Sequence, residues 1–279
     1  MRRDAWQYQA TQKLSSVSDS ARLEAELLLG HVLEVSRAHL MAYPEIILEH
    51  PQLTSLEQYL DQRLNGCPMA YILGTQEFYG LEFNVTQDTL IPRPETELLI
   101  DEVLAITPDE DQGAILDLGT GSGAIACTIA HYRPESQVTA VDFSASALTV
   151  AQQNGQLLGL TNLRWIESDW FDQVSGKFDL IVSNPPYIVE EDPHLESLVY
   201  EPISALTAPK QGMHDLETIA TQARRHFKDT GGWLMMEHGY DQQQACIELL
   251  NSLGYTRVQD LNDLNNQPRL IKGFWNGHQ

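Results

Sequence analysis

The stretch that decides the fold reads Asp117-Leu118-Gly119-Thr120-Gly121-Ser122-Gly123. It overlaps the end of the apolar run 114–118, which has the length of a buried strand. Glycines at this spacing allow the tight turn that joins a strand to a helix, and they let a ligand approach the backbone closely. The sequence therefore predicts a ligand-binding loop between a strand and a helix.

Further short apolar runs follow this stretch at intervals. Together with the first, they are residues 114–118, 137–141, 163–166, 178–183, 233–237, 255–260 and 270–275. Helical patterns fill most of the gaps, and this alternation implies a mostly parallel sheet with helices on both faces. Ligands bind such sheets at the carboxyl ends of the strands. We therefore predict an α/β fold whose site lies at that edge of the sheet.

The first ninety residues have a different pattern. Leucine and valine recur at helical spacing over residues 21–40, and leucines repeat this spacing after Pro51. Aromatic and aliphatic residues then surround Gly74 and Gly80, as is typical of a β-hairpin. The expected parts are a helical domain over residues 1–75, a β-hairpin linker over 76–91 and a catalytic domain over 92–279.

A second motif, Asn184-Pro185-Pro186-Tyr187, ends the apolar run 178–183. The Asn184 side-chain oxygen and the Pro185 carbonyl can each accept one N–H of a planar amine or amide, while the Tyr187 ring stacks against it. The lone pair of such a nitrogen is delocalised. The nitrogen therefore attacks carbon poorly unless hydrogen bonds hold its N–H groups in place. The motif favours methyl transfer to a planar nitrogen that is held in line with the methyl donor. In this arrangement Asn184 also borders the cofactor that donates the methyl group. The structural alternative is a rigid strand exit made by the two prolines.

The glycine loop alone leaves the cofactor open, because Gly119, Gly121 and Ala124 also satisfy the dinucleotide pattern. Asp117 is unfavourable beside a pyrophosphate but favourable beside the ammonium and sulfonium groups of S-adenosylmethionine. We therefore expect S-adenosylmethionine, cradled by Gly119, Thr120, Gly121, Ser122 and Gly123. A purely structural turn between strand and helix is the third interpretation.

Three more side chains are candidates for cofactor binding. Asp142 follows the second strand of the α/β region, where a carboxylate normally binds ribose hydroxyls; the alternative is that it caps the helix starting near Ser144. After the third strand, the Asp169 carboxylate can receive the adenine amine, and Trp170 can border the ring. Alternatively, Trp170 and Phe171 are core aromatics that serve to bury area.

Charge and cysteine content narrow the class of protein. The 279 residues carry 39 acidic and 17 basic side chains, a net charge of −22, which disfavours a nucleic-acid substrate. The densest basic stretch, residues 224–228, fits an ordinary solvated helix face. Three scattered cysteines indicate reduced thiols rather than disulfides or a zinc site, and no metal is expected. Because neither a signal peptide nor a membrane span is recognisable, we expect a cytoplasmic protein without membrane partners.

Taken together, these motifs resemble the bacterial release factor glutamine methyltransferases, the PrmC or HemK family. The matching stretches are residues 117–123, 184–187, 91–97, 168–171, 192–195, 201–202, 205–206 and 237–239, along with the helical front module. The likeness covers essentially the whole chain, although the tetrapeptide alone would be shared with adenine methyltransferases. Residues 265–269 are looser than the family pattern before the last strand, which leaves the role of Arg269 open.

The resemblance implies N5-methylation of the glutamine in the Gly-Gly-Gln motif of class-I peptide chain release factors, with S-adenosyl-L-homocysteine as the other product. It implies a helical domain for substrate recognition, a short β-hairpin and a seven-stranded Rossmann-like methyltransferase domain. It also implies that residues 119–123 hold the methionine part of the cofactor, that Asp142 binds ribose, that Trp170 borders adenine, and that residues 184–187 hold the glutamine amide.

Two other functions fit parts of this pattern. An adenine-N6 methyltransferase acting on DNA or RNA would use the same acceptors, because adenine presents the same planar amine. It would be expected to carry a basic groove and a target-recognition insertion, and the chain has only a small helical module. A cofactor-binding adaptor without enzymatic activity would have no need of an intact Asn184 and Tyr187.

Overall fold

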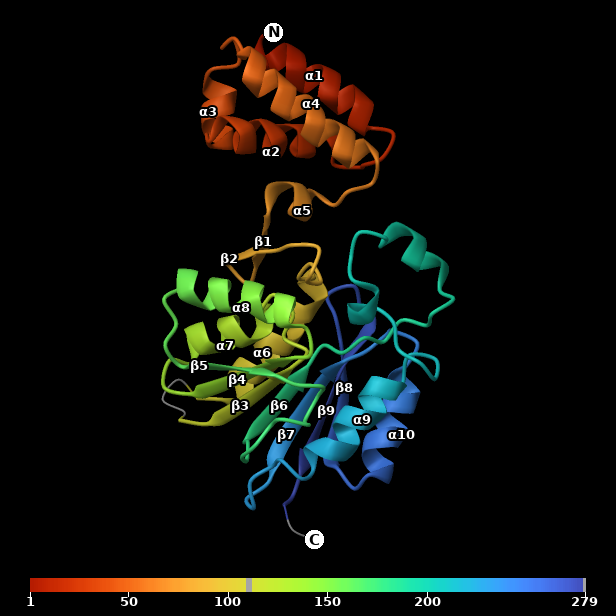
Figure 1. Cartoon of the computed structure of the whole chain (residues 1–279). Coiled ribbons are helices and arrows are strands. Elements are labelled where there is room, and N and C mark those ends of the chain that lie inside the picture. The colour runs from red at the N-terminus through yellow and green to blue at the C-terminus, as the bar shows by residue number, and fades with distance from the viewer. Residues whose placement is uncertain (109–111, 278–279) are drawn as a thin grey trace. The chain divides into compact units, whose positions relative to one another are not determined.

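The computed structural model describes residues 1–108 and 112–277, which divide into two compact units, Met1–Thr75 and Gln76–Gln279 (Figure 1). Each unit has its own buried core. Within the described residues, none of the helices combines the length and apolar character needed to cross a bilayer.

The smaller unit is helical. Its elements are α1 (Arg3–Leu14), α2 (Ala21–Leu33), α3 (Arg37–Ala42), α4 (His50–Leu64) and α5 (Met69–Leu73). The helices α1, α2 and α4 pack on one another around fully buried side chains of Trp6, Leu14, Leu28, Leu29, Leu56 and Leu60. These large apolar side chains are shared among the three helices, so the helices stabilise one another by packing.

The expectation of one helical pattern over residues 21–40 is wrong in two respects. The helix α2 ends at Leu33, because Glu34 adopts a left-handed conformation with φ 52°, and the Ser36 side chain then caps α3 by accepting from the His39 N–H. The buried stripe also differs from the leucine and valine pattern expected there, since Leu23, one of those leucines, is exposed whereas Ala25 is buried. The helix α1 has no counterpart among the elements expected from the sequence.

The larger unit is built on a seven-stranded sheet. Its strands are β3 (Ala114–Leu118), β4 (Gln137–Asp142), β5 (Leu163–Glu167), β6 (Leu180–Ser183), β7 (Gly232–Glu237), β8 (Thr256–Asn262) and β9 (Pro268–Trp275). The strand order is β5-β4-β3-β6-β7-β9-β8, with β3 to β7 parallel and β8 and β9 antiparallel to their neighbours. Each of the seven predicted runs forms one strand, and this confirms the α/β expectation.

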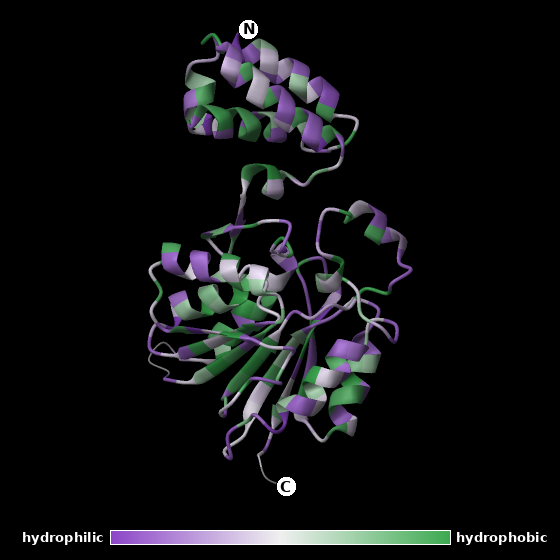
Figure 2. Ribbon diagram, in the orientation of Figure 1, coloured by the Kyte–Doolittle hydropathy of each residue, from purple (hydrophilic) through white to green (hydrophobic). Residues whose placement is uncertain are grey.

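Helices cover both faces of the sheet (Figure 1). One side carries α6 (Glu97–Ile106), α7 (Ala124–Tyr132) and α8 (Ala145–Leu157), and the other carries α9 (His214–Ala223) and α10 (Gln243–Ser252). Successive strand residues point to opposite faces, so Leu180 and Val182 join the core under α6 and α7 while Ile181 joins the core under α9 and α10. Figure 2 shows the hydrophobic residues concentrated along these central strands.

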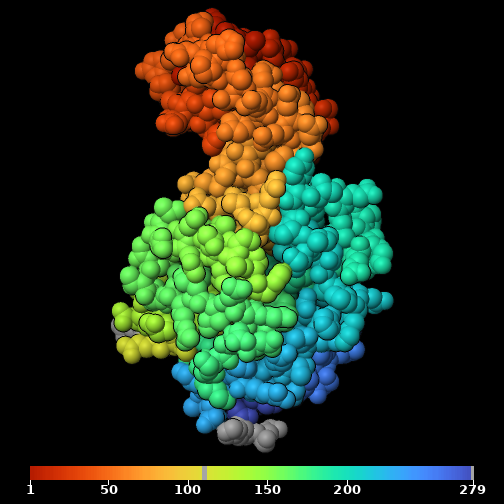
Figure 3. Space-filling model, viewed as in Figure 1, coloured from red at the N-terminus to blue at the C-terminus, as the bar shows by residue number. Residues whose placement is uncertain are grey.

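A β-hairpin, β1 (Thr75–Phe78) and β2 (Leu81–Asn84), precedes the sheet. Short 3₁₀ turns, η1 (Pro94–Thr96), η2 (Pro193–Ser197) and η3 (Ile203–Ala205), lie in the connections. In Figure 3 the teal segment around residues 190–205 forms part of the outer surface of the larger unit. This segment and residues 87–90 both contribute to the site described next.

Candidate functional site

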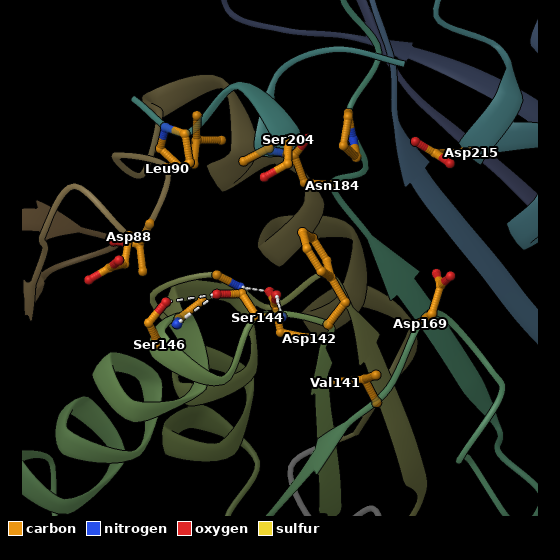
Figure 4. A pocket seen from close by; sticks show the side chains of 18 of the residues that line it. Asp88, Leu90, Val141, Asp142, Ser144, Ser146, Asp169, Asn184, Ser204 and Asp215 are labelled. Carbon is orange, nitrogen blue, oxygen red and sulfur yellow. Dashed lines mark hydrogen bonds between the residues drawn. The ribbon is translucent and has the colours of Figure 1, made fainter. Parts of the chain in front are cut away.

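A pocket of about 490 Å³ lies at the carboxyl ends of β3, β4 and β6 (Figure 4). Its size is in the range of small-molecule and cofactor sites. The lining residues are Gln87, Asp88, Thr89, Leu90, Gly119, Gly121, Val141, Asp142, Phe143, Ser144, Ser146, Ala147, Ser168, Asp169, Trp170, Asn184, Pro186, Pro202, Ser204, Ala205 and Asp215. The structure thus brings both sequence motifs to one cavity, at the edge of the sheet where the sequence analysis placed the site.

The glycine loop forms the floor of this pocket and turns directly into α7. Gly119 has φ 71°, and a Cβ built there would lie 3.4 Å from the Trp170 ring, so the aromatic ring sits directly over the turn. Gly123 has φ 82°, and a Cβ there would lie 3.0 Å from the Cβ of Ala151 on α8. Glycine is therefore required at Gly123 both by backbone conformation and by the close approach of α8.

Asp142 ends β4 and points toward the pocket (Figure 4). One carboxylate oxygen accepts the Gly121 N–H at 2.8 Å, and the other accepts the Ser144 N–H at 2.9 Å. Burial raises the pKa of Asp142, and these backbone hydrogen bonds oppose the increase. The helix-capping role considered for Asp142 falls instead to Ser144, whose hydroxyl accepts the Ala147 N–H. Asp142 therefore ties the glycine turn to the end of β4.

Beyond β5, the two neighbouring aromatic residues have different surroundings. Trp170 lines the pocket with a left-handed backbone, φ 43°, whereas Phe171 is buried and stacks on His226 with a centroid distance of 4.6 Å. Asp215 of α9 accepts a hydrogen bond from the Trp170 side chain, and burial raises the pKa of Asp215. Figure 4 shows Asp169 and Asp215 on the same side of the cavity. Only Phe171 is thus a core aromatic.

Asp117 and its neighbours lie behind the loop rather than in the pocket lining. Asp117 is fully buried, and its Oδ2 accepts the Thr120 hydroxyl at 2.6 Å. Its Oδ1 has no hydrogen-bond partner among the described residues. Burial raises the pKa of Asp117 to about 7, the Thr120 bond lowers it, and the Asp142 charge raises it further. Ser122 is likewise buried, so Asp117, Thr120, Ser122 and Gly123 shape the turn from within.

The second motif forms the opposite wall of the pocket. Asn184 and Pro186 line it, whereas Pro185 is buried. The Asn184 Nδ2 donates to the Thr96 hydroxyl at 3.2 Å, and the Tyr187 hydroxyl donates to Glu237 at 2.9 Å. The motif is therefore attached to η1 and to the end of β7, in addition to the strand from which it emerges.

Two segments that the sequence analysis did not assign to the site complete it. Residues 87–90 follow the hairpin, and residues 202–205 lie in the long connection after β6. The buried carboxylate of Glu201 holds these two segments together, because it accepts the Ile91 N–H at 3.1 Å and pairs with Arg93. The only signal in the sequence was the match of Glu201-Pro202 to the family pattern. The role of Glu201 becomes clear only from its contacts with Ile91 and Arg93 in the folded chain.

Asn154 of α8 is a further residue that the sequence analysis missed. Its buried amide accepts the Asn84 N–H at 2.8 Å and donates to the Asn84 carbonyl at 2.9 Å and to the Ser122 carbonyl at 2.8 Å. One side chain thus joins the end of the hairpin to the glycine turn. Nothing in the local sequence distinguishes this asparagine from an ordinary polar residue of a helix.

Arg269, whose role the sequence left open, lies beside the second motif. Its guanidinium is 3.5 Å from the Tyr187 hydroxyl, 3.4 Å from the His238 carbonyl and 3.5 Å from Asp263. His238 is fully buried between the Gly239 carbonyl and Asp260, at 2.8 and 2.7 Å. His238 is therefore a hydrogen-bonded residue at the end of β7 and does not line the pocket.

Comparisons with known proteins identify the families of the two parts and the shared fold. Residues 5–74 match the family described as PrmC N-terminal domain, and residues 94–208 match the Methyltransferase small domain. Solved structures that share the fold include a methyltransferase from Pyrococcus furiosus, with TM-score 0.54 and 19% identity over 72% of this chain and 91% of that one. A T. thermophilus 16S rRNA methyltransferase in complex with AdoMet and guanosine has TM-score 0.52 and 17% identity, over 71% of this chain and 49% of that one.

Curated relatives match over almost the full length of both chains. The release factor glutamine methyltransferase of Vibrio cholerae is 45% identical over 95% of this chain and 93% of its own. The protein of the same name from Coxiella burnetii is 42% identical over 94% of each chain, and that of Escherichia coli is 40% identical over 96% and 97%. At this identity and coverage, the chain belongs to the release factor glutamine methyltransferase family.

Proposed function

We propose that this protein transfers a methyl group from S-adenosyl-L-methionine to N5 of the glutamine in the Gly-Gly-Gln motif of class-I peptide chain release factors. The observation that carries the proposal is the intact Asn184–Tyr187 motif, whose Asn184 and Pro186 line a cofactor-sized pocket, in a chain of this family. Translation termination is a cytoplasmic process, so we place the protein there.

The residues present fit the cofactor. An aromatic ring lies over the Gly119 turn, the Asp142 carboxylate reaches the cavity from β4, and Asp169 and Asp215 add acidic groups that suit a cationic ligand. When bound, S-adenosylmethionine supplies an electrophilic methyl group on a sulfonium. We assign ribose binding to Asp142, the adenine border to Trp170 with Asp169, and the methionine part to the loop 119–123. The backbone of Gly119 and Gly121 faces the pocket, and the buried members of the loop support it.

For the substrate, we assign the amide acceptors to Asn184 and Pro185. The Asn184 side-chain oxygen and the Pro185 carbonyl each take one N–H of the glutamine amide, and the ring of Tyr187 packs against the amide plane. The two acceptors lend electron density to the nitrogen and align its lone pair. The gain in rate comes from this positioning, since a planar amide needs orientation more than a strong base. The nitrogen loses its proton after the transfer.

The helical unit Met1–Thr75 and the acidic charge suggest how the substrate is recognised. We assign substrate recognition to the helical unit, because residues 5–74 match the PrmC N-terminal domain. A net charge of −22 favours encounter with a basic partner surface and opposes nucleic acid as the direct substrate.

The test is transfer of labelled methyl from S-adenosylmethionine to a purified, unmodified class-I release factor. Parallel reactions contain the same factor with alanine in place of the Gly-Gly-Gln glutamine, and duplex DNA. Label on the wild-type factor alone supports both substrate and site. Label on the alanine variant would refute the assigned site, and label on DNA would move the target to adenine.

A further inference from the structure

We propose that Thr96 and Glu237 are positioning residues that fix which end of the Asn184 side-chain amide faces the pocket. Thr96 ends η1, Glu237 ends β7, and Asn184 follows β6, so three separate elements contribute. Neither Thr96 nor Glu237 lines the pocket. The inference rests on the proposed function, because it concerns how Asn184 presents an acceptor to the glutamine amide.

The three side chains form one continuous chain of hydrogen bonds. The Thr96 hydroxyl donates to Glu237 Oε2 at 2.6 Å, and Asn184 Nδ2 donates to the same hydroxyl at 3.2 Å. Thr96 and Glu237 are buried, at 5% and 2% exposed, so water does not compete for these groups. In such surroundings each buried donor and acceptor has to find its partner within the protein.

The number of hydrogens on each group determines which group donates and which accepts in these hydrogen bonds. A threonine hydroxyl has one hydrogen, and a carboxylate only accepts, so the hydrogen of Thr96 points to Glu237. The Thr96 oxygen can then only accept from Asn184, which therefore turns its NH₂ group toward Thr96. The Asn184 Oδ1 is left on the other side of the amide, as an acceptor. An asparagine amide is nearly symmetric in shape, so packing alone would not select this orientation.

The hydrogen-bond geometry around Glu237 makes it an acceptor for two hydroxyl groups. The Tyr187 hydroxyl donates to its second oxygen at 2.9 Å, so both carboxylate oxygens receive a hydrogen bond. Burial raises the pKa of Glu237; the Thr96 and Tyr187 hydrogen bonds and the nearby Arg269 charge lower it, while Glu95 raises it. The two hydrogen bonds and the Arg269 charge favour the carboxylate form, whereas burial, the largest effect, and the Glu95 charge oppose it.

Loss of these hydrogen bonds would leave the shape of the site intact and change which polar group of Asn184 faces the substrate. An amide free to rotate presents its NH₂ group to the substrate for part of the time, and two donors then face each other. Cofactor binding involves other contacts, so it should be unaffected. The expected defect therefore falls on methyl transfer to the release factor.

The experiment compares Thr96→Val, which removes the hydroxyl at constant shape, with Thr96→Ser, which keeps it. Thr128→Val is the matched control, because Thr128 is fully buried on α7 and its hydroxyl has no hydrogen-bond partner among the described residues. We expect Thr96→Val to lower kcat on the release factor by about 10- to 100-fold, with unchanged affinity for S-adenosylmethionine. Thr96→Ser and Thr128→Val should stay within about threefold of wild type.

Full turnover by Thr96→Val would overturn the proposal, and so would an equal loss in Thr96→Ser. A wild-type protein that does not label the release factor would refute the proposed function instead, so the two failures are distinguishable. Should Thr96→Val not fold, nuclear Overhauser contacts in the wild-type protein decide. Cross-peaks between the Asn184 NH₂ protons and the Thr96 methyl group support the assigned orientation, and their absence overturns it.

Discussion

The hydroxyl of Tyr187 donates to the buried carboxylate of Glu237 across 2.9 Å, which ties the polar end of this ring to the end of β7. The position of the ring is therefore set by β7 as well as by the two prolines before it.

Tyr187→Phe keeps the ring and removes one donor from Glu237. Because a buried acceptor then loses a partner, we expect the free energy of unfolding to fall by about 1–3 kcal/mol, measured by chemical denaturation. Methyl transfer should decrease much less than in Asn184→Ala, since the ring that packs against the amide remains. Unchanged stability would mean that the Tyr187 bond to Glu237 contributes nothing net.

Asn184→Ala removes the proposed amide acceptor from the pocket wall. We expect kcat on the release factor to fall by about 100-fold or more, because an oriented hydrogen bond to the reacting group is lost. Calorimetry should still detect binding of S-adenosylmethionine, which separates this defect from misfolding. Normal turnover in Asn184→Ala would remove Asn184 from the proposed site.

Asp117→Asn tests the buried carboxylate behind the glycine turn. Its pKa is about 7 in the folded chain and ordinarily 3.8, so the folded state holds the extra proton between these values. Stability of the wild-type protein therefore falls as pH rises through this window, and the isosteric amide lacks this penalty.

The measurement is Tm at pH 5.5 and pH 8.5 for both proteins without cofactor. Each kcal/mol of the penalty lowers Tm by about 2–4 °C in a chain of this size. We expect the wild-type Tm to drop relative to Asp117→Asn at the higher pH. Asp142 and Glu237 also have raised pKa values and contribute to the pH dependence of both proteins. The readout is therefore the difference in Tm between wild type and Asp117→Asn. Parallel pH profiles would contradict the assignment.

Asn154→Ala deletes three hydrogen bonds to the backbone of Asn84 and Ser122. We expect a loss of roughly 2–4 kcal/mol in unfolding free energy, because buried backbone groups are left without partners. Affinity for S-adenosylmethionine should fall as well, since the glycine turn loses a support. The exposed Asn251→Ala on α10 is the control, with an expected change within about 0.5 kcal/mol. Equal effects in the two variants would show that the Asn154 bonds carry no stability.

The net charge predicts that association with the release factor depends on salt. If electrostatic attraction speeds the encounter, the association rate should fall several-fold between low salt and about 0.5 M, while the dissociation rate changes little. Stopped-flow fluorescence measures both rates. A rate that does not respond to salt would show that the acidic charge has another purpose.

Much of the fold and part of the site could be predicted, because they depend on local patterns. The run 178–183 is apolar and short enough to indicate a buried strand, and Leu180–Ser183 forms it. The glycine spacing at 119–123 and the Asn184 motif each follow a strand, so a parallel sheet brings them together. Trp170 and Phe171 could not be separated, because two adjacent rings look alike until the β5 exit turns one into the cavity.

The rest depends on contacts between residues far apart in the chain. Asp215 reaches the pocket from α9, and Glu201 becomes a tether only when the chain brings Ile91 beside it. The helix break after Leu33 did have a local signal, the Ser36 cap, but the leucine periodicity on either side concealed it. Apolar periodicity shows where helices are favourable and does not show where a single left-handed residue ends one.

The Asn154 bridge makes the hairpin and the glycine turn a single cooperative element. An opening that displaces the Asn154 side chain exposes the Asn84 amide to exchange with solvent deuterium and also releases the Ser122 carbonyl. A ligand that stabilises the turn therefore slows this exchange at a position outside the pocket lining. The Asn84 amide becomes a reporter of pocket occupancy, readable by mass spectrometry without any substrate.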